Sequence, residues 1–169
     1  VDILINNAGI SQNSFALDTC IEVDRRVMEL DYFAPIALTK SISLKLIKQE
    51  SGLIINIVSV AGKLGSPMRS AYSGAKHALI GFMDCLRAEV KEYGINIINV
   101  CPGFVKTNIS RNALTGDLTL YDKMDHEIEN GIPAKEFAQR LIKQLSGNKY
   151  EICLLYASPS PRDRTRSRM

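Results

Sequence analysis

Short apolar runs rich in β-branched residues alternate with longer segments of helical periodicity along this chain of 169 residues. Four runs predict strands, at residues 1–6, 53–58, 95–100 and 151–155. Apolar positions at helical spacing predict helices over residues 18–50, 70–93 and 133–147. Pro35 is expected to bend or divide the first helix, and Gly94 to end the second.

This alternation predicts an α/β fold, a doubly wound, Rossmann-like parallel sheet with helices on both faces. The near-continuous apolar character of residues 1–6 predicts a strand that is buried on both faces. Because such a strand needs partners on both edges, we expect the N-terminal strands of the sheet to be missing. Residues 1–156 are therefore expected to form a partial Rossmann-like domain, in which residues 104–131 are a long loop with a function.

The formal net charge of +3 comes from the C-terminal end of the chain. Residues 158–169 hold four arginines and one aspartate, which leaves the rest of the chain without net charge. We expect residues 157–169 to be a disordered basic tail, because Ser, Pro and Arg without apolar residues cannot build a core. A nucleic-acid-binding arm is one interpretation. The favoured one is a non-native tail, since the segment resembles translated adaptor read-through, and no nucleic-acid partner is expected for a neutral body.

The chain has four widely separated cysteines, at positions Cys20, Cys85, Cys101 and Cys153. Without a C-x-x-C pair, neither a zinc site nor a disulfide framework is expected. The two histidines, His77 and His126, lack ligand spacing, so no metal is predicted. Free thiols favour an intracellular, reducing compartment, either the cytoplasm or the endoplasmic reticulum membrane through a missing N-terminal segment.

Tyr72 and Lys76, near the start of the second predicted helix, are suited to proton transfer. They are spaced i and i+4, so their side chains share one helix face. A nearby ammonium lowers the pKa of a phenol by about 1–3 units, toward a range useful near neutrality. Without context, a surface tyrosine and a solvated lysine are the commoner explanation of such a spacing. A functional pair is favoured here because other polar segments follow the predicted strands: Asn7, Ser59 and residues 102–107. Parallel sheets bind ligands beyond the carboxyl ends of their strands.

Four segments in a fixed order resemble the motifs of the short-chain dehydrogenase/reductase (SDR) family. They are Asn6-Asn7-Ala8-Gly9, Ser59 with Ala61-Gly62, Tyr72-x-x-x-Lys76, and Pro102-Gly103-x-Val105-x-Thr107. The resemblance covers about residues 1–155 and is greatest to the subgroup of dehydrogenase/reductase members 7 and 7B. It implies an NAD(P)-dependent oxidoreductase that interconverts a carbonyl and an alcohol by hydride transfer.

The resemblance also implies a role for each matched residue. Tyr72 would be the acid/base, Lys76 would support it and bind the nicotinamide ribose, and Ser59 would hold the substrate oxygen. The same comparison implies that residues 104–131 are a substrate lid. Cofactor contacts are implied for Asn7, Ala8, Gly9, Tyr72, Lys76, Pro102, Gly103, Val105 and Thr107.

Asp31 departs from the family pattern, in which an asparagine at this position supports a water-mediated proton relay to the lysine. An aspartate keeps the shape of the side chain but loses the amide donor. A carboxylate near Tyr72 would also oppose formation of the phenolate. We therefore count Asp31 among the catalytic candidates and hypothesise that proton transfer is weakened but not abolished.

Several properties stay open at this point. No Gly-rich phosphate turn precedes Asn6, so the residues do not distinguish NAD from NADP, and the subgroup resemblance favours NADP(H). Implied partners are a small carbonyl or alcohol, lipid-like by analogy, and a second copy of the chain that contacts helices 18–50 and 70–93. The alternative is a truncated, non-catalytic SDR-like chain that acts only by helix-mediated association.

Overall fold

The structure is a computed structural model that describes residues 1–145, 147 and 149–155, so the predicted tail at 157–169 lies outside the described residues. Its centre is a parallel, four-stranded sheet in the order β1-β2-β3-β6. The strands are β1 (Ile3–Asn6), β2 (Gly52–Ile57), β3 (Ile95–Pro102) and β6 (Glu151–Leu154). They coincide with the four predicted runs, and the parallel pairing confirms the predicted fold class.

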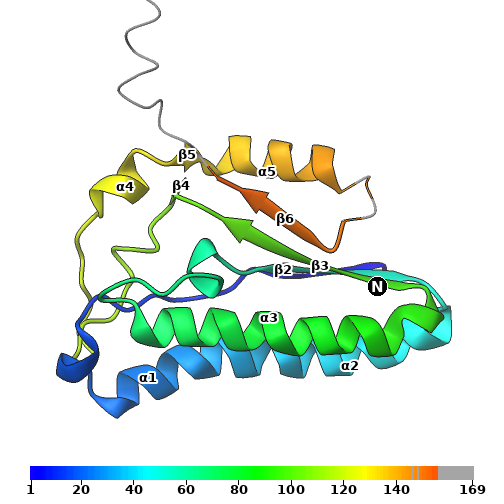
Figure 1. Cartoon of the computed structure of the whole chain (residues 1–169), viewed down its shortest axis with the longest axis horizontal. Coiled ribbons are helices and arrows are strands. Elements are labelled where there is room, and N and C mark those ends of the chain that lie inside the picture. The colour runs from blue at the N-terminus through cyan, green and yellow to red at the C-terminus, as the bar shows by residue number, and fades with distance from the viewer. Residues whose placement is uncertain (146, 148, 156–169) are drawn as a thin grey trace, which may run out of the picture.

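Helices cover both faces of this sheet (Figure 1). They are α1 (Ile21–Met28), α2 (Ala34–Gln49) and α3 (Ser70–Val90) on one face, and α5 (Ala134–Gln144) on the other. The core under α2 and α3 contains the fully buried Leu46, Ile54 and Met83. Ile98 and Ile152 belong to the second core, under α5. No described helix has both the length and the apolar content needed to cross a membrane.

The predicted helix over residues 18–50 is divided in the structure. A π-helical turn, η2 (Glu29–Phe33), joins α1 to α2, and a 3-10 turn, η1 (Ala16–Asp18), stands where the helix was expected to begin. Pro35 lies in the first turn of α2, where its missing N–H breaks no helical hydrogen bond. The π turn directs Asp31 into the interior, where its side chain is fully buried.

Strand β1 departs from the prediction that it is buried on both faces. Within the described chain it is an edge strand that pairs only with β2. Ile3 and Ile5 are 54% and 57% exposed, whereas Leu4 packs toward α2 and α3. The apolar residues that pack beneath α5 come from β2, β3 and β6, so this face of β1 has no helix above it.

Residues 104–131 hold more local structure than the predicted loop. Strand β4 (Val105–Lys106) pairs in parallel with β5 (Ile132–Pro133), and a short helix, α4 (His126–Glu129), lies between them. The segment is fixed to remote parts of the chain, because Leu114 forms a bridge with Gln12 and Asp125 forms an ion pair with Arg69 at 2.6 Å.

The last two predicted helices begin almost where expected. Helix α3 ends at Val90 and is followed by a 3-10 turn, η4 (Lys91–Tyr93). Gly94 then has φ = 68°, and a Cβ there would lie 2.4 Å from the carbonyl oxygen of Glu50, so this turn requires glycine. Along α5, Phe137, Leu141 and Leu145 pack on the second core at i, i+4 spacing, whereas Ile142 is 67% exposed.

Candidate active site

The carboxyl ends of β1, β2 and β3 lie at one edge of the sheet, beside the first turns of α3. The register pairs Asn6 with Asn56 in the first two strands, and Ile57 with Val100 in the second and third. Because parallel strands end at the same edge, the segments that follow them converge there. The fold therefore places the polar residues that follow these strands at one end of the sheet.

Lys76 and Asp31 form a buried ion pair at this edge. The Lys76 Nζ lies 2.9 Å from Asp31 Oδ2, and the two side chains are 5% and 0% exposed. The backbone N–H of Ile10 donates to Asp31 Oδ1 at 2.8 Å, and Lys76 donates to the carbonyl oxygen of Ile57 at 3.4 Å. Burial raises the pKa of the Asp31 carboxyl above its usual value, against the lowering effect of the Lys76 charge and the Ile10 N–H.

Gly9 brings the backbone after β1 directly onto this ion pair. A Cβ at this position would lie 3.0 Å from Asp31 Oδ2 and 3.3 Å from Lys76 Nζ. A side chain here would crowd both charged groups, and glycine avoids this crowding. The family resemblance implies a cofactor contact at Gly9, and the structure places Gly9 against the Asp31–Lys76 ion pair.

Tyr72 precedes Lys76 by one turn of α3. The Lys76 Nζ lies 5.5 Å from the centre of the Tyr72 ring, so the predicted sharing of one helix face is confirmed. The half-buried ring packs on a cluster that includes Val23, Val27 and Ala75. These contacts with α1 fix the ring while the ammonium remains its neighbour.

Ser59 follows β2 and begins a 3-10 turn, η3 (Val60–Gly62). Its Oγ accepts the Ala61 N–H at 3.1 Å, which leaves the hydroxyl proton to donate elsewhere. The turn packs tightly on α3, since a Cβ at Gly62 would lie 2.8 Å from Ile80 Cδ1 and 3.1 Å from Lys76 Cβ. Ser59 thus has a capping role, and its turn is held against the part of α3 that carries Lys76.

The other predicted cofactor contacts lie in the segments that follow β1 and β3. Those after β1 are Asn7 and Ala8, which are exposed and line a pocket with Leu30 and Pro35. Those at the end of β3 and beyond are Pro102, Gly103, Val105 and Thr107. Pro102 pairs with Leu154, and the Gly103 N–H donates to the Leu154 carbonyl at 2.9 Å. Thr107 is exposed, and its Oγ accepts the Ile109 N–H at 3.3 Å.

Gln12 is a positioning residue that the sequence did not reveal. Its Oε1 accepts the Ala71 N–H at 2.9 Å, and its Nε2 donates to Ser70 Oγ at 3.0 Å. It thereby caps the first turn of α3, where Arg69 stands at the N-cap and makes no side-chain cap bond. The cap and the helix are 59 residues apart, so no local spacing marks the contact.

Comparison with known proteins identifies the family. Residues 1–117 match the family model described as short chain dehydrogenase. The chain belongs to the short-chain dehydrogenase family. "Dehydrogenase/reductase SDR family member 7B" of Xenopus tropicalis is 46% identical over 160 residues, which are 95% of this chain and 52% of the relative. The predicted resemblance to the member 7 and 7B subgroup is therefore confirmed, and the chain spans about half the length of the curated relatives it matches.

Solved structures of the family share the fold. A short-chain dehydrogenase from Streptomyces avermitilis superposes with a TM-score of 0.78 at 26% identity, over 92% of this chain and 60% of that one. A gluconate 5-dehydrogenase from Burkholderia cenocepacia, solved with NADP and tartrate, gives a TM-score of 0.64 at 27% identity, over 66% and 44% of the two chains. The predicted doubly wound sheet is thus the fold of this SDR chain.

Proposed function

We propose that the protein is an NAD(P)-dependent oxidoreductase that interconverts a carbonyl and an alcohol, with Ser59, Tyr72 and Lys76 at its active site. The observation that carries the proposal is the buried Lys76 ammonium beside the Tyr72 ring at the carboxyl edge of a parallel sheet. Family membership supports the reaction class. The proposal applies to the whole protein, since this chain spans about half of its relatives.

The residues present fit the nicotinamide half of such a cofactor. Gly9 leaves room for backbone to approach Lys76, and the ammonium is a suitable donor to ribose hydroxyls. The contacts proposed to hold the group are Asn7, Ala8, Gly9, Tyr72, Lys76, Pro102, Gly103, Val105 and Thr107. When bound, the cofactor supplies or accepts the hydride. We propose NADP(H) as its form on the resemblance to the member 7 and 7B subgroup, and a gluconate 5-dehydrogenase of the same family has been solved with NADP.

Side chains of the protein itself carry out the proton transfer. In reduction, Tyr72 gives its phenolic proton to the carbonyl oxygen, and in oxidation it takes a proton from the alcohol. Ser59 donates its hydroxyl proton to the same oxygen, where negative charge develops. Lys76 places a positive charge beside the Tyr72 ring, where negative charge develops on the phenolic oxygen as the proton leaves.

We assign Asp31 to a positioning role. Its carboxylate contacts Lys76 directly at 2.9 Å, so it fixes the ammonium and offsets much of its charge. The electrostatic effect of Lys76 on the Tyr72 phenol is smaller as a result, which supports the hypothesis of weakened proton transfer. The expected proton relay through water would be replaced by a direct ion pair.

Residues 104–131 are proposed as the substrate lid. The Arg69–Asp125 ion pair and the Leu114 bridge hold this segment over the loop that contains Gln12. The substrate class is a small carbonyl or alcohol, and a lipid-like member of that class rests on analogy alone.

The second candidate is a chain that works by association through its helices, and a group of exposed apolar side chains on the first two helical segments favours it. They are Ile21, Phe33, Leu38 and Leu44, between 48% and 66% exposed. The same surface serves homo-oligomerisation of an active enzyme, so association by itself does not separate the two functions.

The separating experiment is cofactor titration and carbonyl reduction with the full-length protein. We expect saturable NADPH binding that raises the melting temperature. Tyr72→Phe should lower kcat by about 10²–10⁴-fold with little change in the NADPH Kd, since only the proton donor is lost. Tyr93→Phe, at a tyrosine on η4 that is 44% exposed, is the matched control. Full activity in Tyr72→Phe, or no binding of either NADPH or NADH, would overturn the proposal and leave association as the function.

A further inference from the structure

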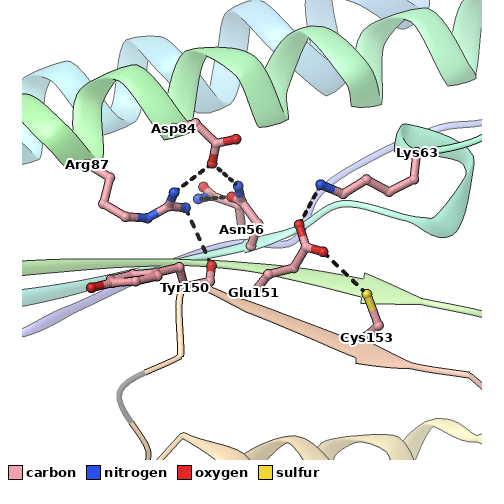
Figure 2. Close-up of polar contacts among 8 residues, drawn as sticks. Asn56, Lys63, Asp84, Arg87, Tyr150, Glu151 and Cys153 are labelled. Atoms are coloured by element: carbon pink, nitrogen blue, oxygen red, sulfur yellow. Dashed lines mark hydrogen bonds and ion pairs between the residues drawn. The ribbon is translucent and has the colours of Figure 1, made fainter.

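A second cluster of reactive side chains lies on the edge strand β6, on the face of the sheet that α3 covers (Figure 2). The parallel register places Cys101 of β3 opposite Cys153 of β6. Glu151 precedes Cys153 by two residues, so both side chains lie on the same face. The two sulfur atoms and one carboxylate oxygen all lie within 4.8 Å of one another.

Lys63 fixes the orientation of the carboxylate. Its Nζ lies 2.5 Å from Glu151 Oε2, while Oε1 lies 3.6 Å from the Cys153 sulfur (Figure 2). One oxygen is therefore neutralised by the ammonium, and the other faces the thiols. A carboxylate that binds a metal is commonly oriented by an outer partner in this way. Both side chains of the Lys63–Glu151 pair are 39% exposed, so an ion can reach the cluster from solvent.

We propose that Cys101, Cys153 and Glu151 Oε1 bind one thiophilic divalent metal ion of the zinc type, with the fourth position open to water. Zinc binds sulfur at about 2.3 Å and carboxylate oxygen at about 2.0–2.2 Å, which in a tetrahedral site separates these ligands by about 3.5 Å. The observed separation of 3.6 Å between sulfur and oxygen agrees with that value.

The charges of the cluster balance once the metal is bound. Two S–H bonds break, two metal–sulfur bonds form, and the two protons pass to solvent. Two thiolates and one carboxylate then face a divalent ion and the Lys63 ammonium, so the site is neutral. Without the metal, burial raises the pKa of the Cys101 thiol to about 12, with Cys153 and Glu151 adding to the effect, and the thiol keeps its proton.

A bound ion would connect elements that carry the candidate active site. Cys101 directly precedes Pro102 and Gly103, which are proposed cofactor contacts. Lys63 directly follows η3, the turn that Ser59 begins. The ion would therefore join the end of β3 to the edge strand and, with Lys63 paired to Glu151, tie η3 to both. Its role would be structural, as a clip at this side of the sheet.

The test is Co²⁺ titration of the reduced, chelator-treated, full-length protein, with Zn²⁺ as competitor. We expect one ion per chain, a thiolate-to-cobalt charge-transfer absorption, its loss when Zn²⁺ is added, and a higher melting temperature with metal. Cys153→Ser should abolish that absorption and weaken binding at least 100-fold. Lys63→Met, which removes only the outer partner, should weaken binding by about 10–100-fold.

Cys85→Ser is the matched control, because Cys85 is also an exposed free thiol but lies on α3 outside the cluster. It should leave both the absorption and the affinity unchanged. The proposal is wrong if the wild-type protein gives no thiolate-to-cobalt band, if Cys153→Ser retains the band, or if Cys85→Ser loses it. Near-ultraviolet circular dichroism shows whether each variant is folded, and Glu151→Gln provides a second variant that keeps both thiols.

Discussion

At the scale of single residues, the ion pair between Asp31 and Lys76 is the feature that sets this chain apart from the pattern it resembles. A buried ammonium needs a partner of opposite charge, and the fully buried Asp31 side chain is that partner. The partner that stabilises Lys76 also cancels part of the field that Lys76 exerts on Tyr72. One side chain therefore acts on stability and on proton transfer in opposite directions.

Replacement of Asp31 by asparagine should separate these two effects. In the full-length enzyme, Asp31→Asn should raise kcat for alcohol oxidation and change its pH profile, because the Lys76 charge would act beside the Tyr72 ring without compensation. The variant should also be less stable, since it leaves a buried cation without its counter-charge. Initial rates measured from about pH 6 to about pH 10 would give the pH profile of kcat.

Glu29→Gln is the control for Asp31→Asn, because Glu29 lies in the same π turn but is exposed. It removes the same charge away from the ion pair and should leave the profile in place. An unchanged kcat and an unchanged profile in Asp31→Asn would contradict the assigned role.

At the scale of elements, a row of asparagines holds β1, β2 and β3 in register. Asn6 donates to Asn56 at 2.8 Å, and Asn56 donates to Asn99 at 3.2 Å. Asn99 in turn donates to Asp84 of α3, which also accepts from Arg87 (Figure 2). Because a slip by one residue would break every bond in the row, these side chains specify the alignment of the strands that carry the candidate active site.

Asn56→Val should destabilise the protein by about 2–3 kcal/mol, because it removes two buried hydrogen bonds and leaves the Asn99 side-chain oxygen without its donor. Urea unfolding monitored by circular dichroism would measure the loss. Asn96→Val replaces an exposed asparagine on the same strand as Asn99 and should change stability by less than about 0.5 kcal/mol. Equal losses in the two variants would show that the row has no special role.

At the scale of the molecule, the segment after β3 is fixed by contacts with residues far away in the sequence. The Arg69–Asp125 pair is only about one-fifth exposed, 22% and 19% for the two side chains, and Arg69 also donates to the carbonyl oxygen of Gln12 at 2.8 Å. One arginine thus joins the loop after β1, the start of α3 and the proposed lid. The position of the lid depends on the assembled fold and not on its own sequence.

Arg69→Gln should loosen residues 104–131. Loss of a partly buried, charge-assisted contact of about 1–2 kcal/mol should raise hydrogen exchange in this segment by about 5–30-fold. Exchange in β3, measured by mass spectrometry in the same experiment, should not change. Arg111→Gln is the control, as Arg111 is exposed within the segment itself. A uniform rise over the whole chain would indicate global destabilisation, and the proposed docking role of Arg69 would then be wrong.

Much of the fold was predictable because it depends on local patterns. The four strands were found to within two residues and α3 to within three, since β-branched runs and helical spacing reflect the backbone geometry directly. The exposure of Ile3 and Ile5 was not predictable, because the burial of a strand depends on which helices pack on it. The division of the first helix was predicted only as one option for Pro35, and the π turn that directs Asp31 inward leaves no signal in the spacing of apolar residues.

The sequence by itself determined the parallel α/β fold, the family, and the pairing of Tyr72 with Lys76, because these depend on spacing within one element or on motifs in order. The tertiary structure alone decided which distant groups meet. It placed Asp31 on Lys76, Gln12 on the first turn of α3, and Cys101 beside Cys153. The physical reason is that pairing between strands and packing between layers join residues whose separation along the chain carries no local pattern.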